Sequence, residues 1–156
     1  MNSYLAIKTL HILTSTVLFG TGLGIAFFFF RAQAETLPAA RYFAARNTVL
    51  ADFLFTLPAV VLQPLTGIWL IVHSGYRWNE PWLLATYALY LLAGVCWVPV
   101  VFIQIRLQAL LKAALATNEA PSADYLELYR RWFLLGWPAF IGLVLVFFLM
   151  VLKPTW

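Results

Sequence analysis

Four apolar runs dominate the chain, and each is long enough to cross a lipid bilayer as a helix. They cover residues 4–30, 48–72, 81–111 and 132–152. A membrane-spanning helix needs about 20 apolar residues. Because hydrocarbon offers backbone groups no hydrogen bonds, only helices and closed barrels span a bilayer. We therefore predict an all-α, polytopic membrane protein built as a four-transmembrane-helix bundle.

The composition supports one membrane domain over residues 1–156. Hydrophobic residues make up 63% of the chain and charged residues 10%, whereas soluble domains average about 45–50% and about 25%. The first apolar run exceeds the ~7–15 residues of a signal peptide core, so we expect it to be a retained span. No basic run supports nucleic-acid binding, and the expected environment is the lipid bilayer.

The basic residues predict the orientation, because cytoplasmic loops of membrane proteins are enriched in Lys and Arg. Seven of the ten flank the connections between spans 1 and 2 and between spans 3 and 4: Arg31, Arg41, Arg46, Arg106, Lys112, Arg130 and Arg131. The other side carries Lys8, Arg77 and Lys153. We predict a bacterial inner membrane protein with both termini outside the cytoplasm.

His11 is the first candidate for a functional side chain. It lies about two turns into the first run, where an ionisable group is costly and often functional. A neutral imidazole can ligate haem iron or copper. The structural alternative is a hydrogen bond to Thr14 or Ser15. In the functional case we expect His11 to point into a pocket between the helices.

Two further residues lie toward the same outer side as His11. His73 ends the second run, and Met150 lies near the end of the fourth. Either could supply a second ligand to haem iron, since both His/His and His/Met ligation occur. The structural alternatives are an interfacial histidine that reaches toward water and a methionine that packs in the core or against lipid.

The second run carries a polar stripe, formed by Asp52, Thr56, Gln63 and Gly67 at helical spacing, and it should face the bundle. Asp52 lies near the expected cytoplasmic end, where four arginines gather: Arg46, Arg106, Arg130 and Arg131. We interpret this set as an ion-pair cluster that closes the bundle. A proton or anion site is the alternative.

Small residues and prolines shape the other helix faces. Gly20 and Gly24 form a GxxxG spacing with Gly22 between them, which allows close approach of a backbone or a flat ligand. Packing and interhelical hydrogen bonds are expected on one face of the third run, which holds Tyr90, Gly94, Trp97, Gln104 and Gln108. Kinks are expected at Pro58, Pro64, Pro99 and Pro138.

Five short motifs carry a family resemblance, and they occupy residues 8–13 (KTLHIL), 57–60 (LPAV), 65–70 (LTGIWL), 129–133 (YRRWF) and 151–154 (VLKP). The layout resembles the HemJ-type protoporphyrinogen oxidases and the CopD-like copper-resistance membrane proteins across nearly the whole chain. It is similar, more closely, to a family of integral membrane proteins defined only as a domain of unknown function.

The resemblance implies that His11 ligates haem b, as the histidine of the first helix is taken to do in the oxidases. Their lysine at the start of the third helix is absent, because residues 82–86 read WLLAT. Their acidic residue before the last proline is replaced within residues 135–137, LGW. These departures argue against the oxidase reaction and leave tetrapyrrole binding through His11 as the expectation.

We therefore weigh three functions. The first is haem b or tetrapyrrole binding through His11, with electron transfer to a respiratory partner; if the protein is an enzyme, it is then an oxidoreductase. The second is a non-catalytic accessory subunit of a larger membrane complex, or a homo-oligomer. The third is a copper or small-solute transporter that uses His11, Met150 and Cys96. No nucleophile or phosphate-loop motif favours hydrolysis or ATP-driven transport.

The charge asymmetry makes the topology testable. Reporter domains fused to either terminus should be active only outside the cytoplasm, because seven of the ten basic residues flank the other two connections. Paired fusions of alkaline phosphatase and green fluorescent protein measure this. A fluorescent fusion at the C-terminus would overturn the orientation.

Overall fold

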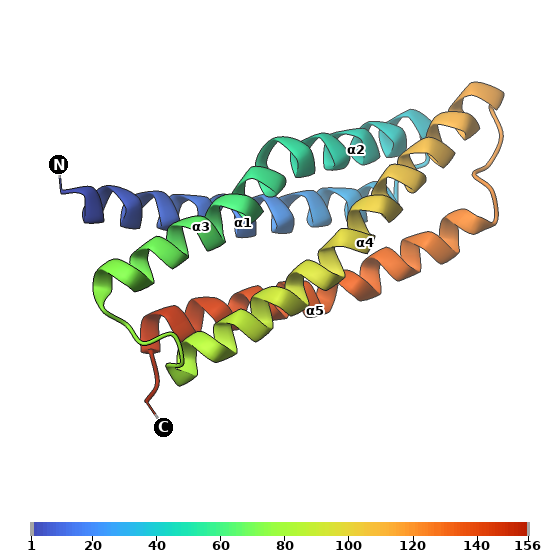
Figure 1. The fold of residues 1–156 in the computed structure, drawn as a ribbon. Helices are drawn as coiled ribbons and strands as arrows, with labels where there is room; N and C mark the ends of the chain where they lie inside the picture. The colour runs from blue at the N-terminus through green and yellow to red at the C-terminus, as the bar shows by residue number, and fades with distance from the viewer. Residues whose placement is uncertain (1, 156) are drawn as a thin grey trace.

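The computed structural model describes residues 2–155 as a bundle of long antiparallel helices (Figure 1). The elements are α1 (Ser3–Ala32), α2 (Pro38–Ala51), a π-helical turn η1 (Asp52–Thr56), α3 (Leu57–Ser74), α4 (Pro81–Thr117) and α5 (Asp124–Leu152). Since α2, η1 and α3 form one continuous segment, four helices are long and apolar enough to cross a membrane. The predicted all-α fold with four spans is confirmed.

Residues at the helix ends explain where most elements begin and stop. Pro38 and Pro81 are the first residues of α2 and α4, where the missing N–H costs nothing. Gly75 (φ 72°) and Asn118 (φ 57°) adopt left-handed conformations that end α3 and α4. The first turn of α2 follows Leu37 and has no side-chain cap.

The second span is longer than its apolar run. Its helix begins at Pro38, ahead of the apolar run that starts at residue 48, because the amphipathic segment before the run is helical as well. Asp52 therefore follows the first residue of this span by fourteen residues, a rise of about 21 Å. The side chain lies in the middle of the bundle rather than near the end that holds the α1–α2 connection.

Two prolines leave backbone groups without their usual partners, and the structure accommodates both. Ahead of Pro58 the helix widens into η1, where Leu57 N–H donates to the carbonyl of Asp52 and α2 and α3 diverge in direction (Figure 1). Pro64 cannot donate to the carbonyl of Val60. That oxygen instead accepts a hydrogen bond of 2.7 Å from the Tyr90 hydroxyl on α4, as expected for freed carbonyls within a membrane.

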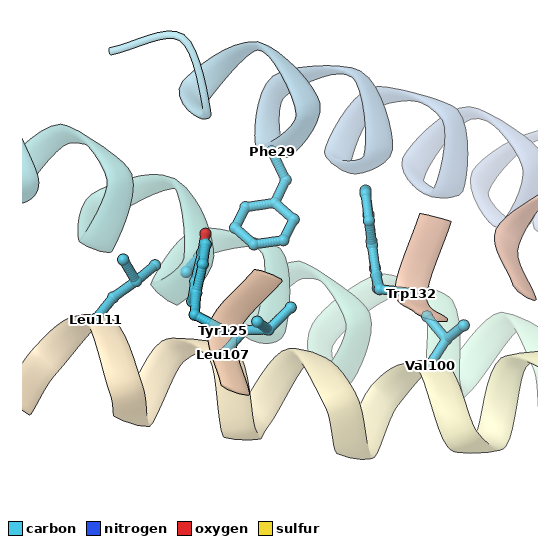
Figure 2. Packing of buried hydrophobic residues seen from close by; sticks show 7 residues of the cluster. Phe29, Val100, Leu107, Leu111, Tyr125 and Trp132 are labelled. Atoms are coloured by element: carbon cyan, nitrogen blue, oxygen red, sulfur yellow. The ribbon is translucent and has the colours of Figure 1, made fainter. Parts of the chain in front are cut away.

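The bundle is tightly packed at the end that holds the α1–α2 and α4–α5 connections. A cluster of buried side chains joins α1, α2, α4 and α5 there: Phe29, Ala45, Val100, Leu107, Leu111, Tyr125 and Trp132. The rings of Phe29 and Trp132 meet edge to face, 5.0 Å between centroids (Figure 2). Tyr125 donates a hydrogen bond of 2.6 Å to Gln33 Oε1, which ties α5 to the end of α1.

A smaller cluster closes the opposite end, where both termini lie (Figure 1). Ile71, Trp82 and Leu83 are buried there, with Leu149 and Met150 packed against them. The outer faces of the helices are apolar and open along their length, as at Leu91, Phe102 and Val151. These faces contact lipid in a membrane, and the two buried clusters lie at opposite ends of the bundle.

Packing at the first cluster predicts a large difference between two leucines of α4. Leu107 is fully buried and Leu91 is 68% exposed on the lipid-facing side. Leu107→Ala should lower the free energy of unfolding in mixed micelles by about 2 kcal/mol, since buried packing contacts are lost. Leu91→Ala should change it by less than about 0.5 kcal/mol. Equal effects would contradict the packing described here.

Candidate functional site

A cavity of about 360 Å³ lies in the middle of the bundle, between the two packed ends. α1, η1, α3, α4 and α5 all contribute to its walls. Most of the wall is apolar, and nine aromatic side chains line it: Phe19, Phe27, Phe30, Tyr90, Trp97, Trp132, Phe133, Trp137 and Phe140. A volume above ~300 Å³ with a few polar groups is typical of a small-molecule site.

The polar part of this wall comes from η1 and α4. Asp52, Thr56 and Gln104 are 2%, 3% and 4% exposed, and all three line the cavity. Trp97 Nε1 lies 3.4 Å from Asp52 Oδ1 and donates a long hydrogen bond to it. π-Helical turns such as η1 often mark functional positions within helices.

Three oxygen atoms in this polar group lack a protein partner. Within residues 2–155, Asp52 Oδ2, Thr56 Oγ1 and Gln104 Oε1 are buried and accept no hydrogen bond. Thr56 and Gln104 are both neighbours of the Asp52 carboxyl group. Unpaired polar atoms in apolar surroundings cost free energy, so the fold retains three costly acceptors at one place beside an open volume.

The ion-pair cluster predicted around Asp52 is not formed. No arginine of the described residues lies within salt-bridge distance of its carboxylate, and the one ion pair among them joins Arg131 to Glu127. Arg106 and Arg131 line a surface hollow with Asp124 and Glu127 instead. The prediction fails for Arg46 and Arg130 as well, because Asp52 lies deeper in the bundle than the apolar run suggested.

The cavity reaches the lipid-facing surface between α1 and α5. Its lining includes Leu23 and Trp137, which are 47% and 51% exposed. Two aromatic pairs bridge these helices, Phe19 with Phe140 and Phe30 with Phe133, at centroid distances of 5.2 Å and 5.9 Å. Between the two pairs the lining residues Gly22 and Gly136 carry no side chain, which leaves room for a molecule to enter from the bilayer.

His11 lies outside this cavity, in a polar contact between α1 and α3. Its Nδ1 lies 2.7 Å from Thr66 Oγ1, and its ring packs beside Gly67, where an added Cβ would lie 3.4 Å from Cε1. Gln63 Nε2 donates to the carbonyl of His11 at 2.7 Å and to the Thr14 hydroxyl. His11 therefore does not line the central cavity, and its ring is held against α3 by Thr66.

The Thr66 contact also fixes the imidazole tautomer. The Thr66 hydroxyl lies 2.6 Å from the carbonyl of Leu62 and 3.2 Å from that of Gln63, so its one proton is donated within α3. Thr66 Oγ1 therefore accepts a hydrogen bond from Nδ1–H of His11, and Nε2 keeps its lone pair. Metal-binding histidines are commonly oriented in this way by a partner on the other ring nitrogen.

The other two ligand candidates lie in separate environments. His73 is exposed, its Nδ1 lies 2.9 Å from the carbonyl of Trp69, and its ring stacks on the Trp69 ring at 3.6 Å. Met150 packs against the cluster of Ile71, Trp82 and Leu83. Within residues 2–155, no three His, Cys, Asp or Glu side chains are placed to hold a metal ion together.

Sequence patterns identified several residues that line the cavity, but they did not predict that these residues surround one cavity. The stripe on the second span faces the bundle as predicted, with Asp52 and Thr56 on the cavity and Gln63 bonded to α1. Tyr90, Gly94, Trp97 and Gln104, interpreted as a packing face, line the cavity. The aromatic wall of α5 was missed, because Trp132, Trp137 and Phe140 lie in a run that is apolar on every side.

Four spanning helices around a lipid-accessible cavity define an integral membrane protein of the multi-pass class. The chain belongs to the family described as "Predicted integral membrane protein (DUF2269)", whose model matches residues 5–154. That description names no reaction or ligand. The comparisons with curated proteins and with solved structures gave no match.

Proposed function

We propose that this protein binds a small lipophilic molecule inside the bilayer, in the cavity between its helices. The observation that carries the proposal is a volume of about 360 Å³ with aromatic walls and one cluster of unpaired polar oxygens. Such a wall suits a ligand with an apolar body and a single polar group. The body replaces missing packing contacts, and the polar group satisfies atoms that are otherwise costly to bury.

The position of the opening supports uptake from the lipid phase. The gap between α1 and α5 lies at Gly22 and Gly136, between two aromatic pairs that bridge the helices. A lipophilic molecule concentrates in the bilayer and can enter sideways without crossing water. The closed cluster around Phe29 and Trp132 blocks the direct route from the nearer membrane surface.

A leucine at Gly22 should fill the cavity and abolish binding. An added Cβ at Gly22 meets nothing within 4 Å, so the side chain can extend into the space without a backbone clash. The measurement is photolabelling of the membrane-embedded protein by a diazirine analogue of 4-phenylbutanol, with unlabelled 4-phenylbutanol as competitor. We expect the probe to label Trp97 and Trp137 and unlabelled 4-phenylbutanol to suppress this labelling. In Gly22→Leu the suppressible labelling should be reduced about tenfold or more.

Gly20→Leu is the matched control. Gly20 lies on the same helix and also has open space around it, but it is not part of the cavity wall. Both substitutions replace a poor helix former by a good one, so helix stability changes alike. Labelling that the unlabelled alcohol does not compete, or an equal loss in both variants, would refute the proposal.

A second candidate is haem b bound through His11, which the resemblance to HemJ-type oxidases suggests. The specific observation in its favour is that Thr66 accepts Nδ1–H and leaves the Nε2 lone pair for a metal. His11 is not among the cavity-lining residues. A haem iron held by His11 would therefore be a separate ligand from the occupant of the cavity.

Haem titration tests this candidate. Purified protein supplied with haem should develop a saturable Soret band, and His11→Ala should remove it while the helical content stays unchanged. His73→Ala serves as the control, because the His73 ring is stacked on Trp69 at the surface. If the unmodified protein takes up no haem, or if His11→Ala binds it equally, the candidate fails.

A further inference from the structure

We infer that the cavity selects an organic ammonium ion, that is, a lipophilic primary amine whose charged group lies against Asp52. The inference rests on the proposed ligand-binding function and names the chemical class of the ligand. Three observations carry it: the count of unpaired acceptors, the sign of the charge in the cavity, and the aromatic character of the walls.

Each of the three unpaired oxygens can accept a hydrogen bond, and their number matches the three donors of an ammonium group; the Thr56 hydroxyl can in addition donate its own proton to Asp52. Asp52 Oδ2, Thr56 Oγ1 and Gln104 Oε1 lack hydrogen-bond donors within residues 2–155, and Thr56 and Gln104 neighbour the Asp52 carboxyl. A primary ammonium offers three N–H donors and no acceptor. A hydroxyl group offers one donor, and a carboxylate ligand offers none.

The charged residue that lines the cavity is acidic. Asp52 is its only acidic lining residue, and no lysine, arginine or histidine appears in the wall. No described arginine forms a salt bridge with Asp52. An ionised carboxylate in apolar surroundings requires a positive partner, and a cationic ligand supplies one. A negatively charged ligand would face the same carboxylate without any compensating group.

The walls favour an organic cation over a bare metal ion. Tyr90, Trp97 and Trp132 line the cavity, and aromatic faces attract ammonium groups through their electrostatic quadrupole. A metal ion would fill a small part of about 360 Å³ and leave the apolar wall without contacts. An amine with an aromatic or short alkyl body places its charged group against Asp52 and its apolar body against the aromatic wall.

The test compares three competitors that share one apolar body. 4-Phenylbutylamine, 4-phenylbutanol and 4-phenylbutyrate differ in a single polar group, and each competes with the diazirine analogue of 4-phenylbutanol in lipid nanodiscs. We expect the amine to compete at a concentration about tenfold or more below that of the alcohol. The carboxylate should compete more weakly than the alcohol.

Asp52→Asn isolates the role of the charge, because the side chain keeps its shape. The ratio of the competing concentrations of alcohol and amine should fall to about one in Asp52→Asn, because the amide carries no charge for the ammonium group to meet. Partitioning of each probe into lipid cancels in this comparison between proteins. Asp124→Asn, which removes an exposed acidic residue at the start of α5, should leave the ratio unchanged.

The outcomes separate this inference from the function on which it rests. Equal competition by amine and alcohol in the unmodified protein, or an amine advantage that persists in Asp52→Asn, overturns the ammonium assignment and leaves the lipophilic site intact. If none of the three competitors suppresses labelling in the unmodified protein, the lipophilic site itself is refuted. Thermal stabilisation by sodium chloride but not choline chloride, without any preference for the amine, would assign the oxygens to an inorganic cation and overturn the inference.

Discussion

The fold depends on one constraint, which is that polar groups within a bilayer must find partners inside the protein. Helical backbone bonds meet most of it, and at several positions side chains reach between helices. Tyr90 donates to the Val60 carbonyl that Pro64 leaves free, and Thr66 and Gln63 satisfy His11 and its carbonyl. The oxygens of Asp52, Thr56 and Gln104 have no such partner. They lie beside the cavity.

The cavity lies between two clusters of packed side chains, one at each end of the bundle. Aromatic and aliphatic side chains fill the cluster around Phe29 and Trp132, and a smaller cluster with Trp82 fills the other end. Between them, η1 displaces α3 from the line of α2 (Figure 1). Glycines on α1 and α5 leave the opening toward lipid unfilled. The same proline-linked turn that bends the second span thus presents Asp52 to the cavity.

The sequence predicted the number and helical nature of the spans, because hydropathy over ~20 residues decides both. It also predicted that the stripe containing Asp52 and Gln63 faces inward. The partners of these residues were not predictable, since they depend on how far the second helix extends before its apolar run and on how α4 is rotated against it. Asp52 thus seemed close to the arginines, although Trp97 and Gln104 are its neighbours. The hydrogen bond that was the structural alternative for His11 is formed, but its partner is Thr66 on a different helix rather than Thr14 or Ser15.

A crystal structure grown in lipid with 4-phenylbutylamine present tests the central claim most directly, because it locates both the cavity and the charged group of its occupant. The account predicts ligand density between α1, α4 and α5, with the amine nitrogen within hydrogen-bonding distance of Asp52 Oδ2. It also predicts that Gly22 and Gly136 border the opening. A cavity filled by the side chains of Trp132 and Trp137, or an arginine paired with Asp52, would contradict it.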